Sequence, residues 1–128
     1  MTQAARILLV EVNEDGTVGG SHQYLFDLAR SLDRTRFTPI VLFYEDNRFA
    51  TMLRGLGIRT LTWERERRRE RFTPGAFRKI RQMGHMLSSI WRRARLLRKE
   101  RIALVHMNSA PGVSIHDWVP AAKLSRIP

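Results

Sequence analysis

The residues whose types and spacing point most clearly to ligand binding form a short glycine turn, V-G-G-S-H at residues 18–22. Gly19 and Gly20 permit a positive φ and a close approach of another molecule to the backbone, which a side chain would obstruct. Ser21 can cap a helix that begins here, and the exposed amides at the start of a helix bind anions. The turn therefore predicts either a phosphate-binding site or a tight connection between a strand and a helix.

A second polar group follows an apolar run near the end of the chain. Asn108 and Ser109 come directly after residues 102–107, which are continuously apolar apart from His106. The carboxyl end of a strand is the usual ligand edge of an open α/β sheet. An asparagine can hydrogen-bond to a polar ligand, but it cannot transfer protons near neutral pH. We therefore expect binding rather than acid–base chemistry at this edge.

The four histidines do not indicate a metal site, because no two of them combine metal-ligand spacing with a carboxylate partner. His22 has two open interpretations, contact with a bound phosphate and a solvated surface position. His106 is expected to be structural, because it alternates inward along its strand. His85 and His116 are expected on the surface. The chain has no cysteine, which excludes a disulfide framework and a thiolate nucleophile.

Apolar runs alternate with amphipathic runs along the chain, which favours parallel strands joined by helices. Asn47 is expected to cap the second helix and Gly57 to end it. Pro39 is tolerable only at the first position of a strand or at an edge, and Pro120 implies a kink or a late helix start. The pattern predicts a Rossmann-like, doubly wound α/β fold with a parallel sheet of about four strands in three α/β/α layers. The expected strands cover residues 6–12, 38–44, 58–62 and 102–107, and the expected helices cover residues 21–32, 47–56, 77–99 and 113–125.

Length and composition indicate one domain with an ordinary core, since the chain has 128 residues of which 43% are hydrophobic. No apolar run approaches the length of a membrane span, and no signal-peptide pattern is present, so we expect a cytoplasmic protein. The net charge of +11 is concentrated in one segment. Residues 65–101 contain 14 Lys and Arg against three Glu, and the remainder of the chain is neutral.

This basic segment combines a cationic side with an apolar stripe over residues 77–97, and it has several interpretations. A helix of this kind can lie on an anionic membrane. It can also pack on the sheet with its arginines solvated. Nucleic-acid binding without sequence preference is less favoured, because aromatic residues for stacking are few and no known motif is present. The candidate membrane or anion patch comprises Arg67, Arg68, Arg69, Arg78, Lys79, Arg81, Arg92, Arg93 and Arg95.

Several nucleotide-binding folds do not fit the residues. The dinucleotide fingerprint requires G-x-G-x-x-G, whereas the glycines here are Gly16, Gly19 and Gly20. A P-loop requires a lysine after its last glycine, and none follows Gly20. A phosphoreceiver domain needs an aspartate at the end of the third strand, where this chain has T-L-T at residues 60–62.

The remaining pattern resembles the N-terminal domain of family 4 retaining glycosyltransferases, which have the two-domain GT-B fold. The resemblance lies in V-G-G-S-H-Q-Y-L-F-D-L-A-R-S-L-D-R-T-R-F, P-I-V-L-F-Y, L-R-G-L-G-I, L-V-H-M-N-S and A-A-K-L-S-R-I-P. It covers nearly the whole chain except the basic segment. It implies that residues 1–128 are a truncated acceptor-side domain, and that the C-terminal domain, which binds the donor, is absent.

The resemblance also implies roles for individual residues. Gly19, Gly20 and Ser21 match the turn that faces the donor diphosphate, and His22, Asn108 and Ser109 are candidates on the side of the acceptor or sugar. Many family members have H-x-H where this chain has H-M-N, so no catalytic histidine is assignable. Members with H-x-N-S generally have another histidine after the fifth strand, which we expect beyond the last residue.

The implied reaction transfers a hexose from a UDP- or GDP-linked donor, with retention, to a hydroxyl of a glycan, polysaccharide or lipid-linked acceptor. No cofactor is implied within these residues, and the isolated domain is expected to be inactive. The implied location is the cytoplasm, either free or peripheral on the inner face of the membrane. The alternative is a non-catalytic basic α/β module that binds nucleic acid or another anionic partner.

Overall fold

A computed structural model describes residues 3–12, 18–63, 75–109 and 117–128. Several sequence-based predictions lie outside these residues. They are the predicted cations Arg67, Arg68 and Arg69, the position of His116 and the beginning of the last predicted helix.

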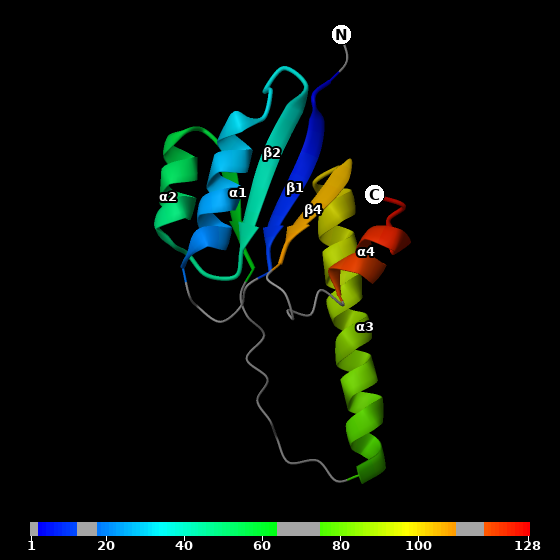
Figure 1. Ribbon diagram of the computed structural model, residues 1–128. Helices are drawn as coiled ribbons and strands as arrows, with labels where there is room; N and C mark the ends of the chain where they lie inside the picture. The colour runs from blue at the N-terminus through cyan, green and yellow to red at the C-terminus, as the bar shows by residue number, and fades with distance from the viewer. Residues whose placement is uncertain (1–2, 13–17, 64–74, 110–116) are drawn as a thin grey trace.

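The fold is a parallel sheet of four strands with helices in the connections (Figure 1), which confirms the predicted doubly wound α/β class. The strand order is β3-β2-β1-β4, and every neighbouring pair is parallel. The strands are β1 (Ala5–Glu11), β2 (Phe37–Phe43), β3 (Arg59–Thr62) and β4 (Leu104–Asn108). The helices are α1 (Gly20–Ser31), α2 (Arg48–Gly55), α3 (Gly75–Lys99) and α4 (Trp118–Leu124).

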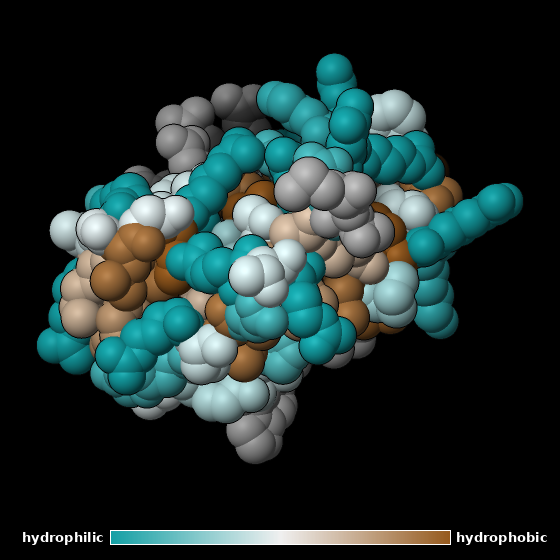
Figure 2. Space-filling model, turned by 90° about the horizontal axis from the view of Figure 1, so that it is seen from above, coloured by the Kyte–Doolittle hydropathy of each residue, from teal (hydrophilic) through white to brown (hydrophobic). Residues whose placement is uncertain are grey.

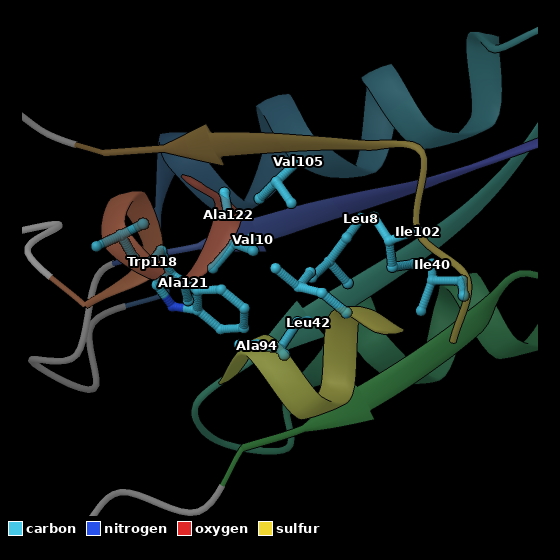
Figure 3. Close-up of a cluster of buried hydrophobic side chains, with 12 residues drawn as sticks. Leu8, Val10, Ile40, Leu42, Ala94, Ile102, Val105, Trp118, Ala121 and Ala122 are labelled. Carbon is cyan, nitrogen blue, oxygen red and sulfur yellow. The ribbon is translucent and has the colours of Figure 1, made fainter. Parts of the chain in front are cut away.

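Two hydrophobic clusters bury the two faces of the sheet. On one face, Ile7 and Leu9 of β1 pack with Leu25 and other residues of α1 and α2. On the other face, Leu8 and Val10 pack with residues of α3 and α4 (Figure 3). Because β1 is covered on both sides, its sequence is apolar at successive positions rather than alternating.

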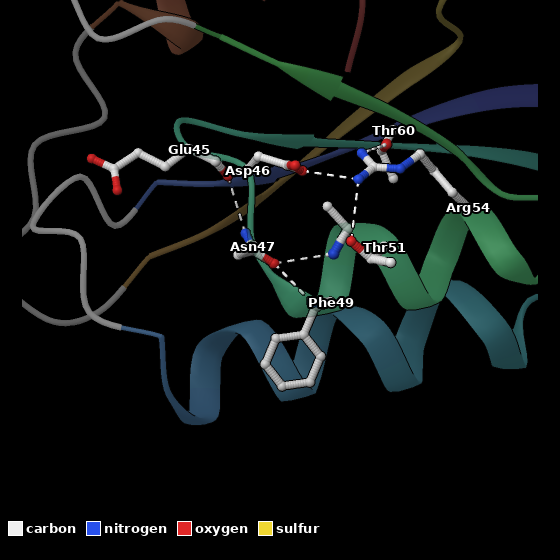
Figure 4. A network of polar contacts seen from close by, with 8 residues as sticks. Glu45, Asp46, Asn47, Phe49, Thr51, Arg54 and Thr60 are labelled. Carbon is white, nitrogen blue, oxygen red and sulfur yellow. Dashed lines mark hydrogen bonds and ion pairs between the residues drawn. The ribbon is translucent and has the colours of Figure 1, made fainter.

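Local signals fix the ends of α2. The Asn47 side chain accepts hydrogen bonds from the backbone amides of Phe49 at 2.9 Å and Ala50 at 3.0 Å (Figure 4). Gly57 has a φ of +72°, the left-handed conformation that follows many helices. The predicted cap and the predicted end of this helix are therefore both confirmed.

The two prolines in regular elements occupy tolerated positions. Pro39 is the third residue of β2 rather than its first, but the pairing with β3 begins only at Ile40, so β2 is a local edge there. Pro120 is the third residue of α4, within the first turn, where no intrahelical amide bond is lost. The late helix start is thus the correct alternative for the described part of this segment.

The long helix α3 has two different halves. Its carboxyl-terminal half packs on the sheet, with Ala94 and Leu97 buried and Ile90 partly buried against the same cluster. Every described side chain over residues 77–88 is exposed. Figure 1 shows this amino-terminal half projecting beyond the sheet.

A surface hollow lies between the carboxyl ends of α1 and α2. It is lined by Phe26, Arg30, Arg34, Met52, Leu56 and Ile58. Figure 2 shows hydrophobic atoms gathered over these helices in the view from above. Helices in this fold run antiparallel to the strands, so the hollow lies at the amino-terminal edge of the sheet, away from the usual ligand edge.

Candidate functional site

The glycine turn and Asn108 meet at the carboxyl edge of the sheet, next to the ends of β1 and β4. The order of the strands reverses between these two strands, which makes this place the topological switch point of the sheet. The chain passes from β1 to β2 on one side, whereas β4 lies on the other side of β1. Glu11, the last residue of β1, is in register with Asn108, the last residue of β4. Ligands of open α/β sheets bind at this switch point.

Gly19 and Gly20 are both exposed at this edge. Gly19 has a φ of −144°, and Gly20 begins α1, so neither glycine adopts the positive φ that its residue type permits. A Cβ atom added at either position would meet nothing within 4 Å. Neither backbone conformation nor packing against the described residues requires glycine here, and the backbone is open to a close approach from outside.

Ser21 does not cap α1, which corrects the sequence-based expectation. The helix begins one residue earlier, at Gly20, with Gly19 at the cap position and no side-chain cap hydrogen bond. The Ser21 hydroxyl instead lies 3.3 Å from Nδ1 of His22. In contrast to α2, where Asn47 occupies two amides, the first turn of α1 receives no side-chain cap. A helix start of this kind can bind an anion.

His22 is 5% exposed, so its interpretation as a solvated histidine is wrong. Its ring stacks on Phe43, with centroids 5.7 Å apart and planes 3° apart, and lies 6.2 Å from Phe49. The spacing to Leu25 and Phe26 on the buried side of α1 is the signal that sequence reasoning missed. His22 anchors the turn, and its buried position argues against direct contact with an acceptor.

Asn108 connects the strand ends to the glycine turn. Its Nδ2 donates to Oε2 of Glu11 at 3.0 Å and to the backbone oxygen of Ser21 at 2.9 Å. Both partners are acceptors, which fixes the orientation of the amide. Because both amide hydrogens are used within the protein, Asn108 has no amide hydrogen left to donate to a sugar, and its place on the sugar side stays a prediction. Only its Oδ1 is suited to an external hydroxyl.

Glu11 is a site residue that the sequence analysis missed. Its side chain is buried, with 1% of the residue exposed, below the glycine turn. A carboxylate buried in a strand needs hydrogen-bond donors, and Asn108, distant in sequence, is one of them. The available signal was a single glutamate within an otherwise apolar strand.

The remaining polar residues at this edge have clear positions. His106 is half-buried on β4, with its ring centroid 6.3 Å from that of Tyr24 on α1. Ser109 is exposed immediately after β4 and stays a candidate at the rim of the site. His85 is exposed on α3, as expected. Within the described residues, no group of three or more His, Asp or Glu is placed to hold a metal ion.

The predicted cationic patch divides into exposed residues and one buried residue. The exposed members on α3 are Arg78, Lys79, Arg81, Arg92 and Arg95. Arg93 is 6% exposed, so its assignment to the patch is wrong. Its guanidinium lies 5.2 Å from the ring centroids of both Trp63 and Trp118, and its Nη1 donates to the Ser89 hydroxyl and lies 3.5 Å from Asp117. No described helix is long and apolar enough to cross a membrane.

No protein-family model and no curated protein matches the sequence. Among solved structures, the chain is similar to the Anabaena protein HepE in complex with UDP and glucose, with a TM-score of 0.54 and 18% identity. The match covers 95% of this chain and 28% of that protein. The likeness shows a shared α/β fold, and the present chain spans little more than a quarter of its structural relative.

Proposed function

We propose that the chain is the N-terminal domain of a family 4 retaining glycosyltransferase, which transfers a hexose from a nucleoside diphosphate to an acceptor hydroxyl. The family assignment rests on the sequence resemblance, and the α/β fold shared with HepE is consistent with it. UDP and glucose, the ligands named for HepE, are together the parts of a nucleotide sugar. The resemblance implies that the donor is held mainly by a C-terminal domain that these residues do not include.

One observation carries this proposal. Gly19 and Gly20 lie exposed at the switch point, where neither φ nor contacts with described residues call for glycine. A side chain at either position would enter the space just outside the first turn of α1. Backbone amides that have no side-chain cap point into this space, and such amides can bind a diphosphate. Binding of a diphosphate there would explain why both positions are glycine.

The turn supplies electrostatic stabilisation in the proposed reaction. The bond from the anomeric carbon to the diphosphate oxygen breaks, a bond to the acceptor oxygen forms, and the proton of the acceptor hydroxyl passes to the departing diphosphate. Negative charge accumulates on the departing diphosphate. The start of α1 carries a partial positive charge, and such a charge stabilises a nearby anion by about 0.3–1 kcal/mol at an exposed site.

Asn108 acts as a positioning residue in this scheme. Its two hydrogen bonds hold the Ser21 carbonyl and the Glu11 carboxylate together, and thereby fix α1 against the ends of β1 and β4. Ser109 and Oδ1 of Asn108 are left to contact the acceptor or sugar. The acceptor is a hydroxyl of a glycan or of a lipid-linked glycan, and the donor nucleotide is UDP or GDP.

An NMR titration of the ¹⁵N-labelled chain with millimolar UDP tests the proposal. The expected result is chemical-shift change at the amides of Gly19, Gly20 and Ser21. The matched control is the start of α2, where the amides of Phe49 and Ala50 are already bonded to Asn47 and are expected to stay unchanged. Uridine, which lacks the diphosphate, should give no change at the turn. UDP-induced changes confined to other residues would refute the assignment of this site.

A further inference from the structure

The projecting half of α3 presents a continuous apolar flank to solvent. Six large side chains contribute to it, with Phe77, Ile80 and Trp91 exposed by 70%, 69% and 62%. The complete apolar flank is Phe77, Ile80, Met83, Met86, Leu87 and Trp91. Apart from the adjacent Met86 and Leu87, successive members are three or four residues apart, which places the set within one half of the helix circumference over a length of about 21 Å. Exposed apolar residues normally occur singly, so a row of this length indicates an interaction surface.

Charge distinguishes this helix from an ordinary exposed helix. The 25 residues of α3 contain eight Lys and Arg and no Asp or Glu. Arg93 is buried and contributes nothing outside, whereas Arg78, Arg81 and Arg92 are exposed on the side that adjoins the apolar flank. A helix with an apolar side and flanking cations is suited to the boundary between lipid headgroups and acyl chains.

We infer that the projecting half of α3 docks in the plane of an anionic lipid bilayer. The apolar flank enters the headgroup–acyl boundary, and the exposed cations contact lipid phosphates. Trp91 lies at the point where the helix leaves the sheet, so it marks the edge of the inserted segment. This docking does not depend on the proposed sugar transfer.

Other occupants fit these observations less well. A second copy of the chain would bring two helices together that both carry cations and no carboxylates, which is electrostatically unfavourable. Nucleic acid would satisfy the cations, but four of the six residues in the apolar flank are aliphatic or methionine and offer no ring for base stacking. A lipid surface is the partner that accommodates both the charge and the apolar row.

The position of the helix gives the docking a consequence for the site. The strands end at the same edge of the sheet beyond which the amino-terminal half of α3 projects (Figure 1). A bilayer bound along this half therefore lies at the end of the molecule that carries the glycine turn. If the proposed function holds, this arrangement favours an acceptor anchored in the membrane.

Co-sedimentation with vesicles tests the inference on the 128-residue chain. The two vesicle types are phosphatidylcholine alone and phosphatidylcholine with phosphatidylglycerol in a ratio of three to one. We expect binding to the anionic vesicles to be about tenfold tighter or more, and to weaken with added salt. Equal binding to both types, or binding to neither, would overturn the inference.

Two sets of variants separate the apolar contribution from the charge. The combined change Phe77→Ser, Ile80→Ser and Leu87→Ser is expected to weaken anionic-vesicle binding about tenfold. The matched control is Met52→Ser, Leu56→Ser and Leu124→Ser, which changes apolar residues of similar exposure elsewhere and should leave binding unchanged. Equal losses in the two sets would contradict a specific role for α3. Circular dichroism establishes that both proteins stay folded.

The second set of variants replaces exposed cations in the projecting half of α3 by glutamine. Arg78→Gln, Lys79→Gln and Arg81→Gln should remove most of the preference for anionic vesicles. The control Arg34→Gln, Arg48→Gln and Lys123→Gln makes the same change in net charge at exposed positions outside α3 and should retain that preference. If the two triple variants lose it equally, net charge rather than a docking helix accounts for the binding.

Tryptophan fluorescence identifies the inserted residue. Trp118 is 1% exposed and Trp63 is partly buried, so Trp91 is the described tryptophan positioned to move from water into lipid. Anionic vesicles should shift the emission to shorter wavelength, and Trp91→Phe should abolish the shift while retaining most of the binding. Two outcomes would overturn the inference in favour of other partners: tight oligonucleotide binding without vesicle binding, or a concentration-dependent dimer that buries Trp91. UDP titration of the same variants stays unaffected, which separates this test from that of the proposed function.

Discussion

At the scale of single residues, the structure differs from the sequence-based expectations mainly where a polar side chain is buried. His22 stacks on Phe43, and Arg93 lies between two tryptophans. Asn108 uses its amide on Glu11, which is far away in the sequence. These positions depend on contacts between distant elements, whereas propensity and spacing report only on neighbours along the chain. Residue type therefore predicted that the glycine turn and Asn108 lie at the carboxyl edge of the sheet, but it did not predict the contacts that several of these side chains make.

Asp33 gives a prediction about pH at this scale. The hydroxyl of Thr35 donates to Oδ1 of Asp33 at 2.6 Å and the Thr35 amide at 2.9 Å, and together with Arg36 these contacts lower the pKa of Asp33 below its ordinary value of 3.8. A depressed folded-state pKa contributes stability that is present above pH 3.8 and is lost as the pH falls through the folded-state pKa.

The variant Thr35→Val is expected to raise the pKa of Asp33 toward 3.8, because it removes the hydroxyl donor. Carboxyl ¹³C chemical shifts measured across the acid range report this pKa directly. Thr38→Val, at an exposed threonine of β2, serves as the control and should leave the titration of Asp33 unchanged. An identical Asp33 titration in the wild-type protein and the Thr35 variant would show that the hydroxyl contact is unimportant.

At the scale of elements, the ends of α2 were predictable because their signals are local. Asn47 and Gly57 act on amides and dihedral angles within a few residues. Ser21 failed as a cap because α1 begins one residue earlier than its pattern suggested, and a shift of one position moves the hydroxyl away from the free amides. Whether a serine can cap a helix thus depends on the exact residue at which the helix begins, which the residue type alone does not determine.

The variant Asn47→Ala is expected to lower the free energy of unfolding by about 1 kcal/mol, because it leaves two amides of α2 without their acceptor. Asn47→Asp retains an oxygen in place and should stay within a few tenths of a kcal/mol of the wild-type protein. Urea denaturation measures both values. Equal stability of the alanine and aspartate variants would contradict the capping role.

At the scale of the whole molecule, alternating patterns predicted the parallel sheet and its doubly wound class. The sequence did not indicate how far α3 extends past the sheet, because the same apolar stripe runs through its packed and its projecting half. The length of the sheet determines how much of α3 can pack against it, and the strands are too short to cover the amino-terminal half. The packed half is held to the remainder of the molecule by Arg93, which joins α3 to Trp63 after β3 and to Asp117 before α4.

Arg93→Ala is expected to lower the free energy of unfolding by about 2–4 kcal/mol, since it removes two cation–π contacts and leaves Asp117 without its ion-pair partner. Arg95→Ala, an exposed neighbour on the same helix, should change stability by about 0.5 kcal/mol or less. Thermal or urea denaturation distinguishes the two. Comparable small effects of both substitutions would argue against a buried role for Arg93.

The central claim is that the open backbone at residues 19–20 receives a diphosphate, and Gly20→Ala tests it most directly. An alanine here meets nothing within 4 Å and replaces glycine at the start of a helix, so stability should be unchanged or higher by up to about 1 kcal/mol. The affinity for UDP, measured by NMR titration, should fall about two- to fivefold, because the methyl group occupies the approach to the amides and removes their contribution. Gly55→Ala, equally open at the end of α2, should leave UDP affinity unchanged. Unaltered UDP binding by a stable Gly20→Ala protein would contradict the account.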